Sequence, residues 1–192
     1  MREVADRFAV VLDANVLFPF RVRDCLLRFA EAGLYRARWS PQILDEWARN
    51  LIEKRPHLES SIRSQLDAMA RAFPEAMIEG YEELIPALNL PDENDRHVLA
   101  AAIRSGAQHI ITENLRDFPK EAIDVYGIEA MSADQFLSST YELYPSEATS
   151  ALRTMRHSYQ NPPMTPSEFL LDLLRVGLPL TGALARRNID VL

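Results

Sequence analysis

The sequence has few cysteines, glycines and lysines. Among its 192 residues are one cysteine, Cys25, six glycines, and two lysines, Lys54 and Lys120. One cysteine permits no intrachain disulfide, and no cysteine–histidine cluster has the spacing of a zinc site. The modest glycine count and an apolar fraction of 47% argue against a disordered chain. We therefore expect a globular protein.

Long apolar runs are also missing. No segment approaches the roughly 18 uninterrupted apolar residues that a membrane span needs. The first ten residues, MREVADRFAV, are too charged and too short in apolar length for a secretory signal. These absences predict a protein without a membrane segment and with a cytoplasmic location. The length suits one α/β domain with a real core and one helical appendage.

The charge pattern leaves the question of a nucleic-acid partner open. A net charge of −7 argues against such a partner, because phosphate binding uses Lys and Arg. Residues 21–38, however, carry five arginines and only two acids. A guanidinium group pairs phosphate bidentately, but the same side chains can simply solvate a helix face. Charge counting alone does not separate these two interpretations.

Short apolar runs alternate with longer segments of helical spacing in the first two thirds of the chain. The run 8–12 has no polar alternation, which favours a parallel strand buried on both faces. This alternation predicts an α/β fold with a central parallel sheet flanked by helices. The expected strands are 8–12, 34–39, 77–79 and 109–112, and the expected helices are 23–32, 40–51, 60–73 and 92–104.

From about residue 131 the pattern changes to helices separated by proline-containing joints. We expect helices over 133–143, 146–159 and 167–176, the last one ended by Gly177 and Pro179. We therefore predict two domains, 8–130 and a helical C-terminal extension over 131–192. The last helix has an apolar face that we expect to pack on the first domain or to dock a partner. This face consists of Phe169, Leu170, Leu173 and Leu174.

Four acidic stretches carry the functional signal. Asp13 ends the first apolar run, Glu46 lies in an expected helix, and Asp117 follows the last apolar run. Asp92 and Asp95 lie at the start of the helix expected over residues 92–104. Open α/β sheets bind ligands outside the carboxyl ends of their strands, and a buried carboxylate is costly unless a cation or donors compensate it. Because hard divalent cations prefer oxygen ligands, we interpret the four stretches as one metal site.

Each acid also has an ordinary structural explanation. Asp13 could cap a helix that begins near Asn15. Asp92 and Asp95 fit a capping-box-like helix start, where acids favour the helix dipole. Asp117 could begin a turn. Glutamate is frequent on helices, so Glu46 taken alone could be an ordinary helix residue beside the solvent-facing Asp45. No single stretch decides between the two explanations, and the joint pattern is more specific than any of its parts.

The joint pattern resembles the PIN-domain family over about residues 8–130. It is most similar to the VapC-type toxin branch, whose members are endoribonucleases held silent by a cognate antitoxin. Residues after about 130 resemble the C-terminal extension found in a subset of these toxin-like proteins. The segments that carry the resemblance are 12–17, Glu46 in its helix, 91–102, and 111–119.

The resemblance implies a metal-dependent endoribonuclease that cleaves RNA phosphodiester bonds. Asn15 and Thr112 would be polar supports of the site. Asn114 stands where many relatives carry an acid, so either Asn114 or Asp117 completes it. The implied partners are an RNA substrate, a cognate antitoxin and, as a homodimer, a second copy of the chain. The implied ligands of Mg²⁺ or Mn²⁺ are Asp13, Glu46, Asp95 and Asp117, with Asp92 as an additional ligand.

Three other functions are alternatives for an α/β chain with these acidic residues. A haloacid-dehalogenase-like phosphatase needs an acid two residues after its nucleophilic aspartate, where this sequence has Asn15. A receiver domain needs a lysine at the end of a late strand, and neither Lys54 nor Lys120 is placed there. The third is a PIN-like RNA- or partner-binding regulatory module without catalytic activity. The intact acidic set favours the enzyme over this module.

Overall fold

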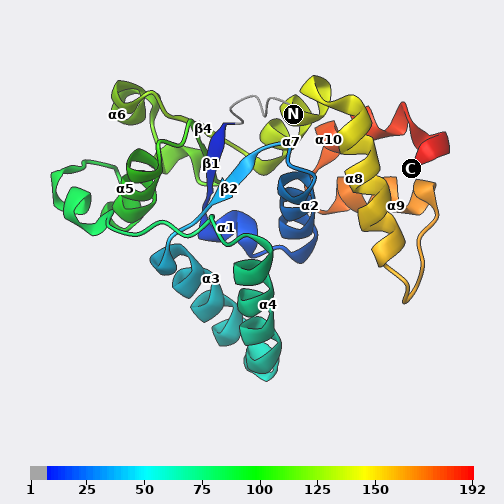
Figure 1. Ribbon diagram of the computed structural model, residues 1–192, viewed down its shortest axis with the longest axis horizontal. Coiled ribbons are helices and arrows are strands. Elements are labelled where there is room, and N and C mark those ends of the chain that lie inside the picture. The colour runs from blue at the N-terminus through cyan, green and yellow to red at the C-terminus, as the bar shows by residue number, and fades with distance from the viewer. Residues whose placement is uncertain (1–7) are drawn as a thin grey trace. The chain divides into compact units, whose positions relative to one another are not determined.

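The computed structural model describes residues 8–192 and contains a four-stranded parallel sheet (Figure 1). The strand order is β2-β1-β3-β4, so β1 lies between two partners. Val10 is in register with Ala37 of β2 and with His109 of β3. This sheet and its flanking helices confirm the predicted α/β class. The strands are β1 (Ala9–Leu12), β2 (Arg36–Arg38), β3 (His109–Ile111) and β4 (Glu129–Met131).

The described chain divides into two compact units, which we call the sheet unit and the helical unit. The sheet unit comprises residues 8–18 and 36–131, and the helical unit comprises 19–35 and 132–192. Residues 19–35 thus group with the C-terminal helices, although they come early in the chain.

The sheet unit buries the whole of β1, whose Val10, Val11 and Leu12 side chains are inaccessible to solvent. Ser40 caps α3 by accepting a hydrogen bond from the Ile43 N–H. The helices of this unit are α1 (Ala14–Leu17), α3 (Pro41–Lys54), α4 (Glu59–Ala72), α5 (Arg96–Ser105) and α6 (Lys120–Ile123). Short 3₁₀ turns span Pro56–Leu58, Glu82–Ala87, Glu93–Asp95, Leu115–Asp117 and Asp124–Tyr126.

Three elements of the sheet unit differ from the sequence-based expectation. The expected strand at 77–79 is reduced to an isolated bridge between Trp39 and Met77. The fourth strand is instead β4, which was not predicted because it is only three residues long and half exposed. The helix expected from Asp92 begins at Arg96, since the Asp92 side chain accepts from the Asn94 N–H and the chain first forms a 3₁₀ turn.

The helical unit packs α2 against α7 and α8, and packs α10 against α7 and α9. Its core includes an edge-to-face pair between Tyr35 and Phe136, whose ring centroids lie 4.8 Å apart. The helices are α2 (Phe20–Glu31), α7 (Ala133–Leu143), α8 (Pro145–Ser158), α9 (Pro166–Arg175) and α10 (Pro179–Arg186), followed by a 3₁₀ turn at Ile189–Val191. None of the helices in residues 8–192 has the length and apolar character needed to span a bilayer.

Most of the apolar face predicted on α9 is buried in the helical unit. Phe169 and Leu173 are fully buried, and Leu170 is nearly so. A Cβ atom at Gly182 of α10 would lie 3.6 Å from the Leu173 Cβ, so the two helices approach closely there. Leu174, the fourth residue of the face, is 56% exposed.

Helix α10 differs from the sequence-based expectation, in which Pro179 ends a helix. Pro179 is in fact the first residue of α10, where its missing N–H costs no hydrogen bond. The next two N–H groups are satisfied by the buried Asp134 carboxylate, which accepts from Leu180 N at 2.8 Å and Thr181 N at 2.9 Å. The carboxylate that caps the start of α10 therefore belongs to Asp134, which precedes Leu180 by 46 positions in the sequence.

The arginine-rich stretch is largely engaged within the helical unit. Arg21 Nε lies 2.9 Å from Asp172 Oδ2, and Arg28 Nε lies 3.4 Å from Asp24 Oδ1. Arg23 is 5% exposed, and burial lowers its pKa to about 10. These contacts favour a structural role for the three arginines over direct phosphate binding.

Candidate acidic active site

Asp13 is delivered to the carboxyl end of β1 by a fully buried strand. Its backbone N–H continues the sheet by donating to Ile111 O of β3 at 3.0 Å. Its side chain caps α1, because Oδ1 accepts from the Ala14 N–H at 2.7 Å. Asp13 is only 4% exposed. The capping role foreseen for this residue is therefore present, and it fixes the carboxylate at the strand end.

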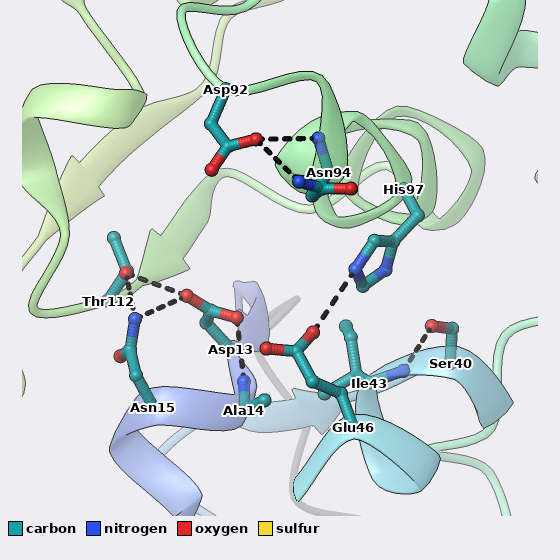
Figure 2. A network of polar contacts seen from close by, with 10 residues as sticks. All are labelled: Asp13, Ala14, Asn15, Ser40, Ile43, Glu46, Asp92, Asn94, His97 and Thr112. Carbon is teal, nitrogen blue, oxygen red and sulfur yellow. Dashed lines mark hydrogen bonds and ion pairs between the residues drawn. The ribbon is translucent and has the colours of Figure 1, made fainter. Parts of the chain in front are cut away.

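Two polar side chains hold the other oxygen of Asp13. Asn15 Nδ2 and Thr112 Oγ1 each donate to Asp13 Oδ2 at 2.7 Å (Figure 2). Asn15 Nδ2 also lies 2.8 Å from Thr112 Oγ1, and Asn15 Oδ1 accepts from the Glu113 N–H. This network joins the ends of β1 and β3, so the Asp13 carboxylate has one defined orientation.

The surroundings of the Asp13 carboxyl group shift its pKa. Burial raises the pKa of Asp13, and the nearby negative charge of Glu46 raises it further. Hydrogen bonds from Thr112 and Ala14, together with His97, act in the opposite direction. Burial is the largest of these effects. The structure thus keeps a carboxyl group where its charged form is disfavoured.

Asp95 shows that the acidic stretches come together. Its pKa is raised to about 6, first by burial and then by the charges of Asp13, Asp92, Asp117 and Glu46. The Asp92 carboxylate also caps the 3₁₀ turn by accepting from the Asn94 N–H at 2.9 Å. The other four acids named from the sequence therefore all lie within electrostatic range of Asp95.

Three of these acids, Glu46, Asp92 and Asp95, border a cleft of about 620 Å³ in the sheet unit, and Asp13 is not among its lining residues. One side is formed by α3 and the other by residues 92–97, with Asn114 at the end of β3. Arg49 is the one arginine or lysine that lines the cleft among the described residues. The lining residues are Gln42, Asp45, Glu46, Arg49, Asn50, Ile85, Asp92, Glu93, Asn94, Asp95, His97 and Asn114.

The structure brings both Asn114 and Asp117 to this region. Asn114 lines the cleft, and its backbone N–H donates to Thr112 Oγ1 at 3.0 Å. Asp117 does not line the cleft, but its charge raises the pKa of Asp95. Arg116 Nε lies 3.7 Å from Asp117 Oδ1 and partly offsets its charge.

His97 is a member of the site that sequence reasoning missed. It is 3% exposed, and its Nε2 lies 3.4 Å from Glu46 Oε2 (Figure 2). A sequence signal existed, because His97 is the one ionisable residue on the buried face of an otherwise alanine-rich helix, two positions after Asp95.

The donor chemistry of the site fits a hard divalent cation. Carboxylate oxygens are the ligands that Mg²⁺ prefers, and a cation would relieve the repulsion that raises the pKa of Asp95. Within residues 8–192, no three His, Cys, Asp or Glu side chains are arranged so that they could hold an ion as they stand. The acids therefore form an interacting cluster whose side chains would have to converge on a metal.

We expect the raised pKa of Asp95 to make stability fall with increasing pH. Its pKa of about 6 lies above the ordinary value of 3.8, so between about pH 4 and pH 6 the folded carboxyl retains a proton that the unfolded one has released. Stability is then lost as pH rises through this window. Because Asp95 is partly exposed, screening reduces the effect to on the order of 1 kcal/mol, or about 2–4 °C in Tm.

The measurement is the Tm of metal-free protein at pH 4.5 and pH 7, compared between wild type and Asp95→Asn. The wild type should lose more stability over this range than the variant. Added Mn²⁺ at pH 7 should raise the Tm of the wild type more than that of the variant. Equal pH dependence in the two proteins would show that Asp95 titrates normally.

A parallel α/β sheet with carboxylates at the carboxyl ends of its strands defines a class of proteins with an acidic cleft. Comparison with known families is more specific. The family model described as PIN domain matches residues 9–116, which is more than half of the chain, and the chain belongs to the PIN-domain family. A second model, described as VapC50 C-terminal domain, matches residues 133–187. These two matches confirm the family resemblance and the C-terminal extension.

A curated protein of Mycobacterium tuberculosis (strain ATCC 25618 / H37Rv), named "Putative ribonuclease VapC50", is 43% identical to this chain over 108 residues. The aligned region covers 56% of this chain and 63% of the relative. The chain thus spans less than two thirds of the length of that relative. No solved structure is a significant match to the chain.

Proposed function

We propose that this chain is an endoribonuclease that cleaves RNA phosphodiester bonds and acts as the toxin of a toxin–antitoxin pair. The observation that carries the proposal is the buried Asp13 carboxylate, oriented by Asn15 and Thr112 at a strand end and surrounded by further acids. Membership of the PIN-domain family and similarity to a protein named as a ribonuclease support it.

We further propose that the site uses Mg²⁺ or Mn²⁺. When bound, such an ion lowers the pKa of a coordinated water and neutralises charge at the phosphate. The residues of the chain would hold and orient the ion. Asn15 and Thr112 fix the direction of the Asp13 carboxylate, and α3 presents Glu46 to the acidic cleft. The acids that would hold the ion are Asp13, Glu46, Asp95 and Asp117, with Asp92 as an additional ligand.

The substrate must bring negative charge into an acidic cleft. A polyanion such as RNA is repelled by unneutralised carboxylates, so its phosphates need a compensating cation. The proposed metal ion would provide that charge at the cleaved phosphate. Arg49 lies one turn after Glu46 on α3 and lines the same cleft, so its guanidinium is placed to pair a neighbouring phosphate.

Several further features stay predictions of the family resemblance. A cognate antitoxin would bind the chain and silence it, and both would be located in the cytoplasm. A homodimer is also predicted. We propose that residues 8–130 form the nuclease domain and that residues 131–192 form its C-terminal extension.

The test of this function is cleavage of mixed tRNA and mRNA by purified, antitoxin-free protein. We expect cleavage in Mg²⁺ or Mn²⁺, and we expect EDTA to abolish it because the carboxylates alone cannot activate water or neutralise the phosphate. Glu46→Gln should lose most activity. Asp45→Asn is the matched control, since Asp45 is the adjacent exposed acid on α3 and lines the same cleft.

The possible results separate the two functions considered. Metal-dependent cleavage that is lost in Glu46→Gln and kept in Asp45→Asn supports the nuclease. RNA binding without cleavage by well-folded protein, in either metal, would instead support the regulatory binding module, in which the acids serve only as caps.

A further inference from the structure

The environment of His97 is unusual for an imidazole. The next five residues of α5, from Val98 to Ala102, are all apolar and fully buried. His97 immediately precedes this buried apolar segment and is itself 3% exposed. A polar ring in such a position is costly unless a polar partner compensates it.

Only one polar partner is found for the ring among the described residues. Nε2 lies 3.4 Å from Glu46 Oε2, and the buried Nδ1 has no hydrogen-bond partner. In Figure 2 the imidazole extends from α5 toward the carboxylate of Glu46, which in turn lies near Asp13. The ring thus links the cleft wall formed by α5 to the one formed by α3.

The need for such a link follows from how differently the two central acids are held. Asp13 receives hydrogen bonds from Ala14, Asn15 and Thr112, and its short side chain has little freedom. Glu46 has a longer side chain that is 36% exposed. Within residues 8–192, the contact with His97 is its one ion-pair contact, and it has no side-chain hydrogen bond.

We propose that His97 is a positioning residue for Glu46. A ring with its proton on Nε2 presents a polar N–H group whose nitrogen lies 3.4 Å from Glu46 Oε2, within ion-pair range. This attraction favours the position of the Glu46 carboxylate near Asp13 and Asp95. The entropy of fixing a flexible glutamate is then lost before any cation or substrate arrives. This inference rests on the proposed function, because it assigns a role within that same acidic site.

Two substitutions distinguish positioning from packing. His97→Leu keeps a similar buried volume and removes the donor, whereas His97→Gln restores an N–H at a similar reach. Removal of a residue that orients a metal ligand commonly weakens metal affinity or activity about 10–100-fold. We expect His97→Leu to weaken Mn²⁺ binding by about this factor, measured by calorimetry without RNA, and His97→Gln to recover most of the affinity.

A double-mutant cycle makes the test specific to Glu46. In a Glu46→Gln background, His97→Leu should change Mn²⁺ affinity less than about twofold, because the carboxylate that it positions is already gone. Equal effects in both backgrounds would overturn the proposal. So would a His97→Leu protein with a lowered Tm and an unchanged Mn²⁺ affinity, since that result indicates packing alone.

Crystal structures of metal-free wild type and His97→Leu provide a readout that needs neither metal nor RNA. We expect the Glu46 carboxylate beside His97 Nε2 in the wild type and displaced in the variant. An unchanged Glu46 would contradict the positioning role. If the wild type binds Mn²⁺ and shows this displacement on substitution but cuts no RNA, the nuclease function fails while the positioning role stands.

Discussion

Asp13→Asn is expected to lower RNA cleavage by at least about 100-fold without unfolding the protein. The reason is that removal of residues that merely orient a metal ligand already costs about 10–100-fold, and Asp13 is proposed to be a ligand itself. Asn keeps an oxygen that can accept from the Ala14 N–H, so the cap of α1 survives. Growth inhibition by the chain expressed alone should be relieved as well.

The stability of the same variant provides the control. Burial raises the pKa of Asp13, so its charged form is disfavoured in the folded protein and its contribution becomes less favourable as pH rises above the ordinary value. A neutral amide removes this cost at pH 7, while Asn15 and Thr112 lose part of their acceptor. We expect a Tm close to that of the wild type, measured by thermal unfolding. Full cleavage by a folded variant would eliminate Asp13 from the active site.

Asp134→Ala is expected to destabilise the helical unit by about 3 kcal/mol. Asp134 is 7% exposed and accepts from Leu180 N, Thr181 N and Thr181 Oγ1 at 2.8–2.9 Å. Alanine leaves these three donors without a partner, and a donor buried without a partner typically costs about 1–3 kcal/mol. The first turn of α10 also loses its cap.

Urea unfolding of the full chain measures this change. Glu142→Ala is the matched control, because Glu142 is an exposed acid on the same helix, α7, and should change the free energy of unfolding by less than about 0.5 kcal/mol. Asp134→Asn should lie between the two, since it retains one acceptor oxygen. A loss in Asp134→Ala no larger than in Glu142→Ala would show that α10 does not depend on this cap.

The sequence was most informative where local pattern and burial agree. The apolar run before Asp13 predicted a doubly buried parallel strand, and β1 is one. The helix expected over residues 40–51 is α3, and Glu46 lies on it as predicted. Local spacing therefore located the elements that present the acids. It failed for β4, whose three residues carry too little periodicity to be recognised.

The acids themselves were named from sequence, because charged residues at the ends of apolar segments are visible without a structure. Their mutual distances were not, since electrostatic coupling among Asp13, Glu46 and Asp95 depends on how α3 and α5 pack beside the strand ends. The same reason hid His97, whose partner Glu46 is 51 positions away, and Asp134, whose partners begin 46 positions away.

By itself, then, the sequence determined the α/β class, the helical character of the C-terminal extension and the identity of the acidic residues. These properties depend on periodicity and residue chemistry within short windows. The tertiary structure alone decided that α2 groups with the C-terminal helices, that Pro179 starts a helix, and that His97 faces Glu46. Each of these depends on a contact between distant residues, and its free energy exists only once the chain has folded.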